Sequence, residues 1–143
     1  MTFTEAERRL LGRARVARLA TADPSGLPHV VPIVFAIDGE RLYTPLDAKP
    51  KTVEPARLKR VRNLVANPQV AVVADEYDED WTRLAWVMVV GRAELVEAGE
   101  AHAEGVRLLE AKYPQYATMP LSGRPLIVVT PTRVRSWGRV ERV

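Results

Sequence analysis

The stretch PHVVPIVFAIDGERLYT, residues 28–44, carries the strongest fold signal of the chain. An apolar run over Pro28 to Ile37 is followed by Asp38-Gly39 and by a second strand-like run over Arg41 to Thr44. Asp-Gly between two such runs is typical of a tight β-hairpin. The stretch therefore predicts two neighbouring antiparallel strands that are joined without a crossover helix.

The run over residues 28–37 has two further properties. It is apolar on both faces, which predicts that both faces are covered. Pro28 and Pro32 have no backbone N–H and cannot donate to a central sheet ladder. They indicate an edge strand, a bulge, or a strand that ends at a ligand.

The rest of the chain follows the same pattern of short strands and short links. Thr4 to Glu7 has the form of a capping box, Gly91 is predicted to bend one long strand, and Pro131 to break another. The predicted helices are 5–14, 55–66 and 98–112, and the predicted strands are 16–22, 28–37, 41–44, 70–74, 84–96 and 125–137. Hairpin links exclude a doubly wound α/β fold. Six antiparallel strands predict a mainly β, α+β domain whose sheet curls into a barrel.

Length and composition bound the class of protein. The 143 residues predict a single domain, 1–143, and the absence of cysteine excludes disulfides and thiolate chemistry. With only His29 and His102, no metal site is predicted, and His102 is expected on the exposed face of helix 98–112. The apolar runs are too short to span a bilayer, and the N-terminal residues lack a signal-peptide core. We therefore expect a cytoplasmic protein with no membrane partner.

The net charge of +3 conceals a basic sector. Six bases stand against the single acid Glu54 between Lys49 and Arg62, whereas residues 75–80 hold five acids and no base. A concentrated basic sector predicts an anionic ligand. Nucleic acid is not the expected partner, because aromatic residues make up only 6% of the chain and do not interleave with these bases.

Thr44, Lys49 and Lys51 form the first candidate site, between a strand end and the start of helix 55–66. A helix N-terminus with free N–H groups and nearby lysines suits a phosphate. The alternative is that both lysines only make a loop soluble. No phosphate loop, dinucleotide fingerprint or nucleophile elbow is present, so in an enzyme a cofactor would supply the difficult step.

Arg57, Arg60 and Asn63 form a second candidate along one side of helix 55–66. Arginine suits bidentate phosphate contacts, but a charged helix face is usually only solvated. Trp81 follows the acidic loop and could form the wall of a ring site or belong to the loop alone. His29 could be a satisfied core histidine or a proton donor beside a bound ring.

An ordered series of short motifs runs along nearly the whole chain: Leu19-Ala20-Thr21, Gly26-x-Pro28-His29-Val30-Val31-Pro32, Tyr43-Thr44 followed by Lys49 and Lys51, Arg62-Asn63-Leu64, Asn67-Pro68 and Val70-Ala71-Val72-Val73. The series resembles the split β-barrel flavin and deazaflavin oxidoreductases related to pyridoxamine 5′-phosphate oxidase. Residues 77–81, Tyr-Asp-Glu-Asp-Trp, resemble a small actinobacterial branch that uses coenzyme F-420. F-420 is a deazaflavin with a phosphate and an oligoglutamate tail.

The resemblance implies an FMN-binding split barrel of Greek-key type with about three flanking helices, and a homodimer with the cofactor at its interface. It implies that Lys49 and Lys51 meet the phosphate with help from Arg57, Arg60 or Asn63, that Thr44 lies beside the ribityl chain, that Val30, Val31 and Pro32 line the ring, and that Trp137 closes the site from the partner subunit. Trp81 would add an aromatic wall. His29 and Tyr43 are the candidate side chains for proton donation, with a solvent molecule or an arginine-polarised carbonyl as open alternatives.

Vitamin B6 oxidase activity is not expected, since the chain lacks the C-terminal arginine–histidine segment of those enzymes and carries Pro50 where they tend to have a base. The basic sector favours F-420, which is more negatively charged than FMN. The sequence therefore predicts an F-420-dependent oxidoreductase that transfers hydride between the deazaflavin and a small organic substrate. An FMN-dependent oxidoreductase and a non-catalytic cofactor-binding protein remain as alternatives.

Overall fold

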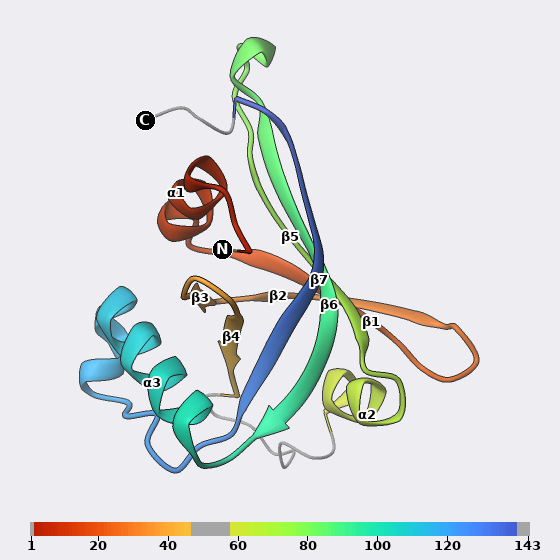
Figure 1. Cartoon of the computed structure of the whole chain (residues 1–143), viewed down its shortest axis with the longest axis vertical. Coiled ribbons are helices and arrows are strands. Elements are labelled where there is room, and N and C mark those ends of the chain that lie inside the picture. Colours follow the sequence, from red (N-terminus) through yellow and green to blue (C-terminus); the bar gives the residue numbers. More distant parts are fainter. Residues whose placement is uncertain (1, 47–57, 140–143) are drawn as a thin grey trace.

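A computed structural model describes residues 2–46 and 58–139 of the chain. Within these residues one antiparallel sheet of seven strands runs in the order β2-β1-β5-β6-β7-β4-β3 and curls around one side of the molecule (Figure 1). This arrangement confirms the predicted α+β split barrel. It has one strand more than predicted, because the run over residues 28–37 is interrupted at residues 34–35.

The observed boundaries lie close to the predicted ones. The helices are α1 (Glu5–Arg13), α2 (Lys59–Ala66) and α3 (Glu100–Lys112), with short 3₁₀ turns η2 (Trp81–Arg83) and η3 (Pro114–Ala117). The strands are β1 (Ala17–Ala22), β2 (Pro28–Ile33), β3 (Ala36–Ile37), β4 (Leu42–Pro45), β5 (Gln69–Glu76), β6 (Ala85–Val96) and β7 (Leu126–Gly138). The predicted start of the second helix, at residue 55, lies outside the described residues.

The predicted hairpin forms between β3 and β4, with Ala36 opposite Tyr43. Its turn does not depend on a positive φ at Gly39. The carboxylate of Asp38 accepts hydrogen bonds from the N–H groups of Glu40 at 2.8 Å and Arg41 at 2.7 Å. The aspartate of the Asp-Gly pair thus stabilises the turn through its side chain.

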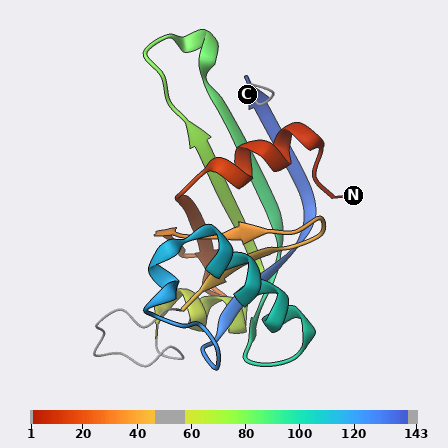
Figure 2. The ribbon, with the colours of Figure 1, turned by 90° about the vertical axis from the view of Figure 1, so that its left-hand side faces the viewer.

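The inner face of the sheet carries the main core. Side chains of β1, β5 and β6 at Leu19, Val72, Val87 and Val89 are at most 1% exposed. Helix α1 crosses this face (Figure 2) and begins with a complete capping box between Thr4 and Glu7. The predicted capping box is therefore confirmed.

The outer face of the sheet is covered over only one part. Helix α3 packs on β4 and β7 there, in a second cluster that includes Tyr43, Val106 and Val128. At Gly105 the helix comes so close that an added Cβ would lie 2.5 Å from Leu126 Cδ1 and 2.7 Å from Tyr43 Cδ2. Glycine in the middle of α3 thus permits this close approach.

Strands β6 and β7 form a long ribbon with a register shift at Val90/Gly91. The extra residue at this bulge is Thr132 of β7, since Val90 pairs with Arg133 and Gly91 with Pro131. The predicted bend of the other strand, β6, at Gly91 stays a prediction. The predicted break near Pro131 takes the form of this bulge: the pairing register shifts there, although β7 continues as one strand to Gly138. Pro131 lies opposite Gly91 at the bulge, where a missing N–H is tolerated.

Two expectations about burial are wrong. Strand β2 is not covered on both faces: Pro28, Val30 and Pro32 are exposed, because β2 lies at the sheet edge and α3 does not reach it. His102 is buried, not exposed, and its Nε2 lies 2.6 Å from the carbonyl oxygen of Arg124. In the described part of the chain, none of the helices has the length and apolar character of a membrane span.

Candidate functional site

The free side of β2 is the first part of the candidate site. In an antiparallel sheet the backbone groups of successive residues alternate between the two sides of a strand. Pro28 and Pro32 have no N–H to give to β1, so this alternation turns residues 28, 30 and 32 toward the free edge. The edge therefore presents the N–H and C=O of Val30 between the carbonyls of two prolines.

The three residues expected to line a ring do not point the same way. Val30 is 60% exposed and shares the outer face with Pro32, whereas Val31 packs its side chain against the inner core. A planar molecule at this edge would therefore contact the side chains of Val30 and Pro32. It would meet Val31 only at the backbone.

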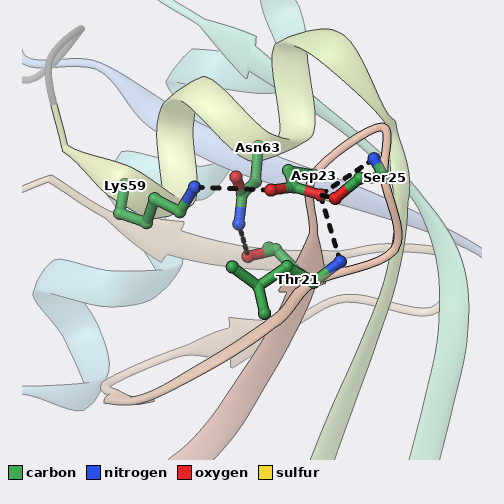
Figure 3. Close-up of polar contacts among 6 residues, drawn as sticks. Thr21, Asp23, Ser25, Lys59 and Asn63 are labelled. Carbon is green, nitrogen blue, oxygen red and sulfur yellow. Dashed lines mark hydrogen bonds and ion pairs between the residues drawn. The ribbon is translucent and has the colours of Figure 1, made fainter.

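The junction between α2 and β1 is built from polar groups. Asn63 is 2% exposed, and its side-chain amide donates to Thr21 Oγ1 at 3.0 Å (Figure 3). Lys59 Nζ lies 3.9 Å from the carboxylate of Asp23 in the turn between β1 and β2. Asn63 thus attaches the helix to the sheet, and its amide nitrogen is already used within the chain.

Asp23 stabilises that turn. Its Oδ1 accepts from the Ser25 hydroxyl at 2.6 Å and from the N–H groups of Ser25 and Leu27 at 2.9 and 3.0 Å (Figure 3). The Ser25 hydroxyl, then the Leu27 N–H, hold the pKa of Asp23 below its usual value. The turn that joins β2 to β1 is therefore well defined beside the first turns of α2.

Tyr43 and Thr44 have partners inside the fold. The Tyr43 hydroxyl donates to Asp38 at 2.6 Å, and burial together with this bond raises the pKa of Tyr43. The Thr44 hydroxyl is buried and donates to the carbonyl of Val34 at 2.8 Å. Both side chains link β4 to its surroundings, and neither lies on the exposed edge of β2.

His29 lies on β2 opposite Thr21 and therefore on the inner face, the reverse of Val30. The residue is half-buried, and its Nδ1 is buried with no hydrogen-bond partner among the described residues. The prediction that His29 donates a proton to a ring stays untested. A ring against the outer side of Val30 and Pro32 would lie across the strand from this imidazole.

Three of the predicted phosphate ligands, Lys49, Lys51 and Arg57, lie outside the described residues. Arg60 is half-buried in the first turn of α2 and has contacts of its own within the chain. The described part of the basic sector is therefore Lys59, Arg60 and the exposed Arg62, all in α2, whose first turn lies next to the β1–β2 turn.

Trp81 and Trp137 lie on the far arm of the molecule, where β5, β6 and β7 extend beyond the core (Figure 1). They are 70% and 53% exposed, and Trp137 pairs with Trp86 across the ribbon. Two positions along the ribbon from that pair, the sheet register runs Pro32–Arg18–Val73–Met88–Arg135. Four strand spacings separate β2 from β7, about 19 Å, so Trp137 cannot touch a ring held at Val30 of its own chain.

The sequence reasoning missed the face that joins these two parts. We use "open face" for the outer side chains of β2, β1, β5, β6 and the second half of β7: Val30, Pro32, Arg18, Ala20, Ala71, Val73, Trp86, Met88, Val90, Arg133, Arg135 and Trp137. Its centre is apolar and only half-buried, and its rim is arginine-rich. This face could have been predicted from residues 70–74 and 84–90, which are apolar without interruption. Strands of that kind are typically packed on both faces.

Comparison with known proteins gives one family. A family model described as pyridoxamine 5′-phosphate oxidase matches residues 3–138. The chain is 27% identical over 139 residues to the 5a,11a-dehydrotetracycline/5a,11a-dehydrooxytetracycline reductase of Streptomyces rimosus, covering 96% of this chain and 84% of the reductase.

Solved structures share the fold. A protein described as an F420 reductase is 29% identical with a TM-score of 0.68, covering 93% of this chain and 98% of that one. The conserved hypothetical protein Rv2991 of Mycobacterium tuberculosis is 23% identical with a TM-score of 0.75, over 95% of this chain and 85% of that one. A haem-binding protein of Mycobacterium smegmatis is 20% identical with a TM-score of 0.74, and the match covers 94% of this chain but only 53% of that one.

Proposed function

This chain belongs to the pyridoxamine 5′-phosphate oxidase family, a family with oxidoreductase members, and from that premise we propose that it is an F-420-dependent reductase. It would transfer hydride between the deazaflavin and a small unsaturated organic substrate. The observation that carries the proposal is the free edge of β2 beside a basic helix start. The two similar proteins described as reductases support the same chemistry.

The β2 edge fits the polar rim of a flavin or deazaflavin ring. Such a rim alternates hydrogen-bond donors and acceptors, and the edge offers one N–H and one C=O at Val30 flanked by two proline carbonyls. The exposed side chains of Val30 and Pro32 give the ring an apolar contact. The six bases between Lys49 and Arg62 exceed what one phosphate needs and suit a cofactor with extra carboxylates.

The cofactor would supply the hydride when it is bound. The chain would position the ring by backbone hydrogen bonds, and the bases between Lys49 and Arg62 would neutralise the negative charge of the cofactor. We assign the proton that must accompany the hydride to solvent water. The edge of β2 is exposed, whereas the Tyr43 hydroxyl is held by Asp38 and His29 lies on the inner face.

The proposal includes a homodimer in which the open face of one copy covers that of another. Val73, Met88 and Val90 form an apolar strip there that no described helix covers. Apolar patches rimmed by charge typically mark interaction surfaces. A second copy would also bring its Trp137 and Trp81 toward a ring at β2, which the roughly 19 Å within one chain does not allow.

The test is a pair of fluorescence titrations of the purified chain, with F-420 and with FMN. We expect tight F-420 binding, weaker FMN binding, and reduction of a polycyclic enone by reduced F-420. Val30→Pro removes the edge N–H and should weaken F-420 binding about tenfold. Val30→Ala is the matched control, because it keeps that N–H and removes only the side chain.

A second arm addresses the basic sector. Lys49→Ala combined with Lys51→Ala should weaken F-420 binding severely while the circular dichroism spectrum stays unchanged. Equal binding by this double variant would remove the lysines from the site. Tight FMN binding with weak F-420 binding would move the chemistry to flavin, and cofactor binding without any enone or quinone reduction would favour a carrier.

A further inference from the structure

A pocket of about 330 Å³ opens at the start of β1, between this strand and the C-terminal end of α3. Its walls include Val16, Val34, Tyr113, Tyr116 and Met119, with Arg15 at the side. This volume is that of a small-ligand site, and the walls are mainly apolar and aromatic, as in typical ligand pockets.

The aromatic floor is held in place before any ligand arrives. The Tyr113 hydroxyl accepts from the N–H of Phe35 at 3.1 Å and lies within donating distance of the carbonyls of Arg15, at 2.9 Å, and Phe35, at 3.1 Å. The Tyr116 ring meets the Tyr113 ring edge to face, with centroids 6.2 Å apart. Both tyrosines are at most 6% exposed, so a flat molecule would find a rigid surface.

Two cations lie against these rings without a carboxylate partner. Arg15 lines the pocket, whereas Lys112 lies behind it and donates to the carbonyl of Leu11 at 3.1 Å. The Arg15 guanidinium lies 4.6 Å from the Tyr113 ring centroid and donates to the carbonyl of Lys112 at 2.9 Å. The Lys112 ammonium lies 5.5 Å from the same centroid and 4.0 Å from that of Phe35. No carboxylate in residues 2–46 or 58–139 forms an ion pair with either group.

The pKa of Lys112 indicates that the surroundings of its amine are apolar and positively charged. Burial, and then the nearby charge of Arg15, lower the pKa of Lys112 to about 8. An anion bound beside Arg15 would relieve that repulsion. The apolar walls favour an apolar ligand, and the positive charge without a carboxylate partner favours an anionic group on that ligand.

We propose that this pocket binds a small aromatic carboxylate, with its ring between Tyr116, Met119 and Val34 and its carboxylate on the Arg15 guanidinium. Arginine can hold a carboxylate through two parallel hydrogen bonds. One N–H of Arg15 is used by the Lys112 carbonyl, and an arginine carries five.

The pocket is separate from the phosphate-binding end of the proposed cofactor site. Val16, which precedes β1, and Thr21 within it are five residues apart, about 17 Å in extended chain. Thr21 is the residue that holds α2 through Asn63. The pocket wall at Val34 follows Pro32 by two residues, so the pocket adjoins the ring end of that site. The inference uses no contact with the cofactor, and the titration with F-420 described below tests whether the two sites are separate.

The experiment is a calorimetric titration of the intact chain with 2-naphthoate, with 2-naphthylmethanol as the neutral probe of the same shape. We expect naphthoate to bind and the alcohol to bind at least tenfold more weakly. Arg15→Gln should weaken naphthoate binding about tenfold or more, and Met119→Trp should abolish it by filling the pocket. Arg9→Gln is the matched control, an exposed α1 arginine paired with Glu5.

Three results would overturn the proposal: no naphthoate binding by the unchanged chain, equal binding of acid and alcohol, or binding that survives both pocket variants. The titration is repeated with saturating F-420. Unchanged naphthoate affinity supports a separate site, whereas competitive loss would assign the aromatic anion to the cofactor groove. Failure of the proposed function would leave the naphthoate result intact.

Discussion

The outer face of the sheet has two halves with the same apolar pattern and different surroundings. Under α3, Tyr43, Leu126 and Val128 are at most 1% exposed. On the open face, Val73, Met88 and Val90 are equally apolar but remain half-buried. Among the described residues the chain covers the first half with α3 and leaves the second uncovered, and this difference is the basis for the dimer proposed above.

The strongest test of this contrast places the same charge in both halves. Val128→Asp would bury an unpaired carboxylate under α3 and should prevent folding, since such burial costs several kcal/mol against a total stability of about 5–15 kcal/mol. Val90→Asp should leave the monomer folded and abolish the proposed dimer. Circular dichroism measures whether each variant folds, and analytical ultracentrifugation measures whether it dimerises.

Either of two results would remove the contrast. A Val90→Asp chain that fails to fold would mean that the open face is part of the monomer core. A Val90→Asp chain that stays dimeric would place the dimer interface elsewhere.

A smaller effect tests how closely α3 covers its half. Gly105→Ala gains helix propensity of about 1 kcal/mol but forces a methyl against Tyr43 and Leu126, and overpacking typically costs 1–3 kcal/mol. We expect a net loss of about 1 kcal/mol in urea unfolding. Gly12→Ala in α1 is the matched control, because nothing lies within 4 Å of its added Cβ, and it should gain up to about 1 kcal/mol. Equal gains at both sites would show that α3 is held loosely.

The smallest effect is a pH dependence at the C-terminal end of α3. The pKa of Lys112 is lowered to about 8 in the folded chain, by burial first and by Arg15 second, against 10.5 for a free lysine. Between these two pKa values the unfolded chain holds more protons than the folded chain, so the free energy of unfolding rises with pH in that window. Below the window Lys112 is protonated in both states and adds no pH dependence. Urea unfolding at pH 7.5 and pH 10 of the unchanged chain and of Lys112→Met isolates this contribution. An identical pH response of the two proteins would contradict it.

Much of the fold followed from local sequence signals. The capping box at Thr4 and the Asp38-Gly39 hairpin were predicted from residue chemistry within a few positions, and both are present. Pro28 and Pro32 also indicated an edge strand, and β2 is one. Such signals survive because they depend on backbone geometry that the residues impose on themselves.

The site was less predictable. Asn63 looked like a phosphate ligand on a polar helix stripe, but it is buried against Thr21, 42 positions earlier. His102 looked exposed and is buried under the carbonyl of Arg124. In both cases the hydrogen-bond partner comes from a distant segment of the chain, and helical periodicity does not predict such a partner.

The sequence by itself determined the antiparallel class, the main helices and strands, and the basic sector, because hydrophobic period, turn chemistry and charge are local properties. Only the tertiary structure decided which face of each strand is covered. It also brought Arg15 and Lys112, 97 residues apart, to one aromatic floor and left the open face bare. Those outcomes depend on how α3 packs across the sheet, and that packing is set by contacts between residues far apart in the chain.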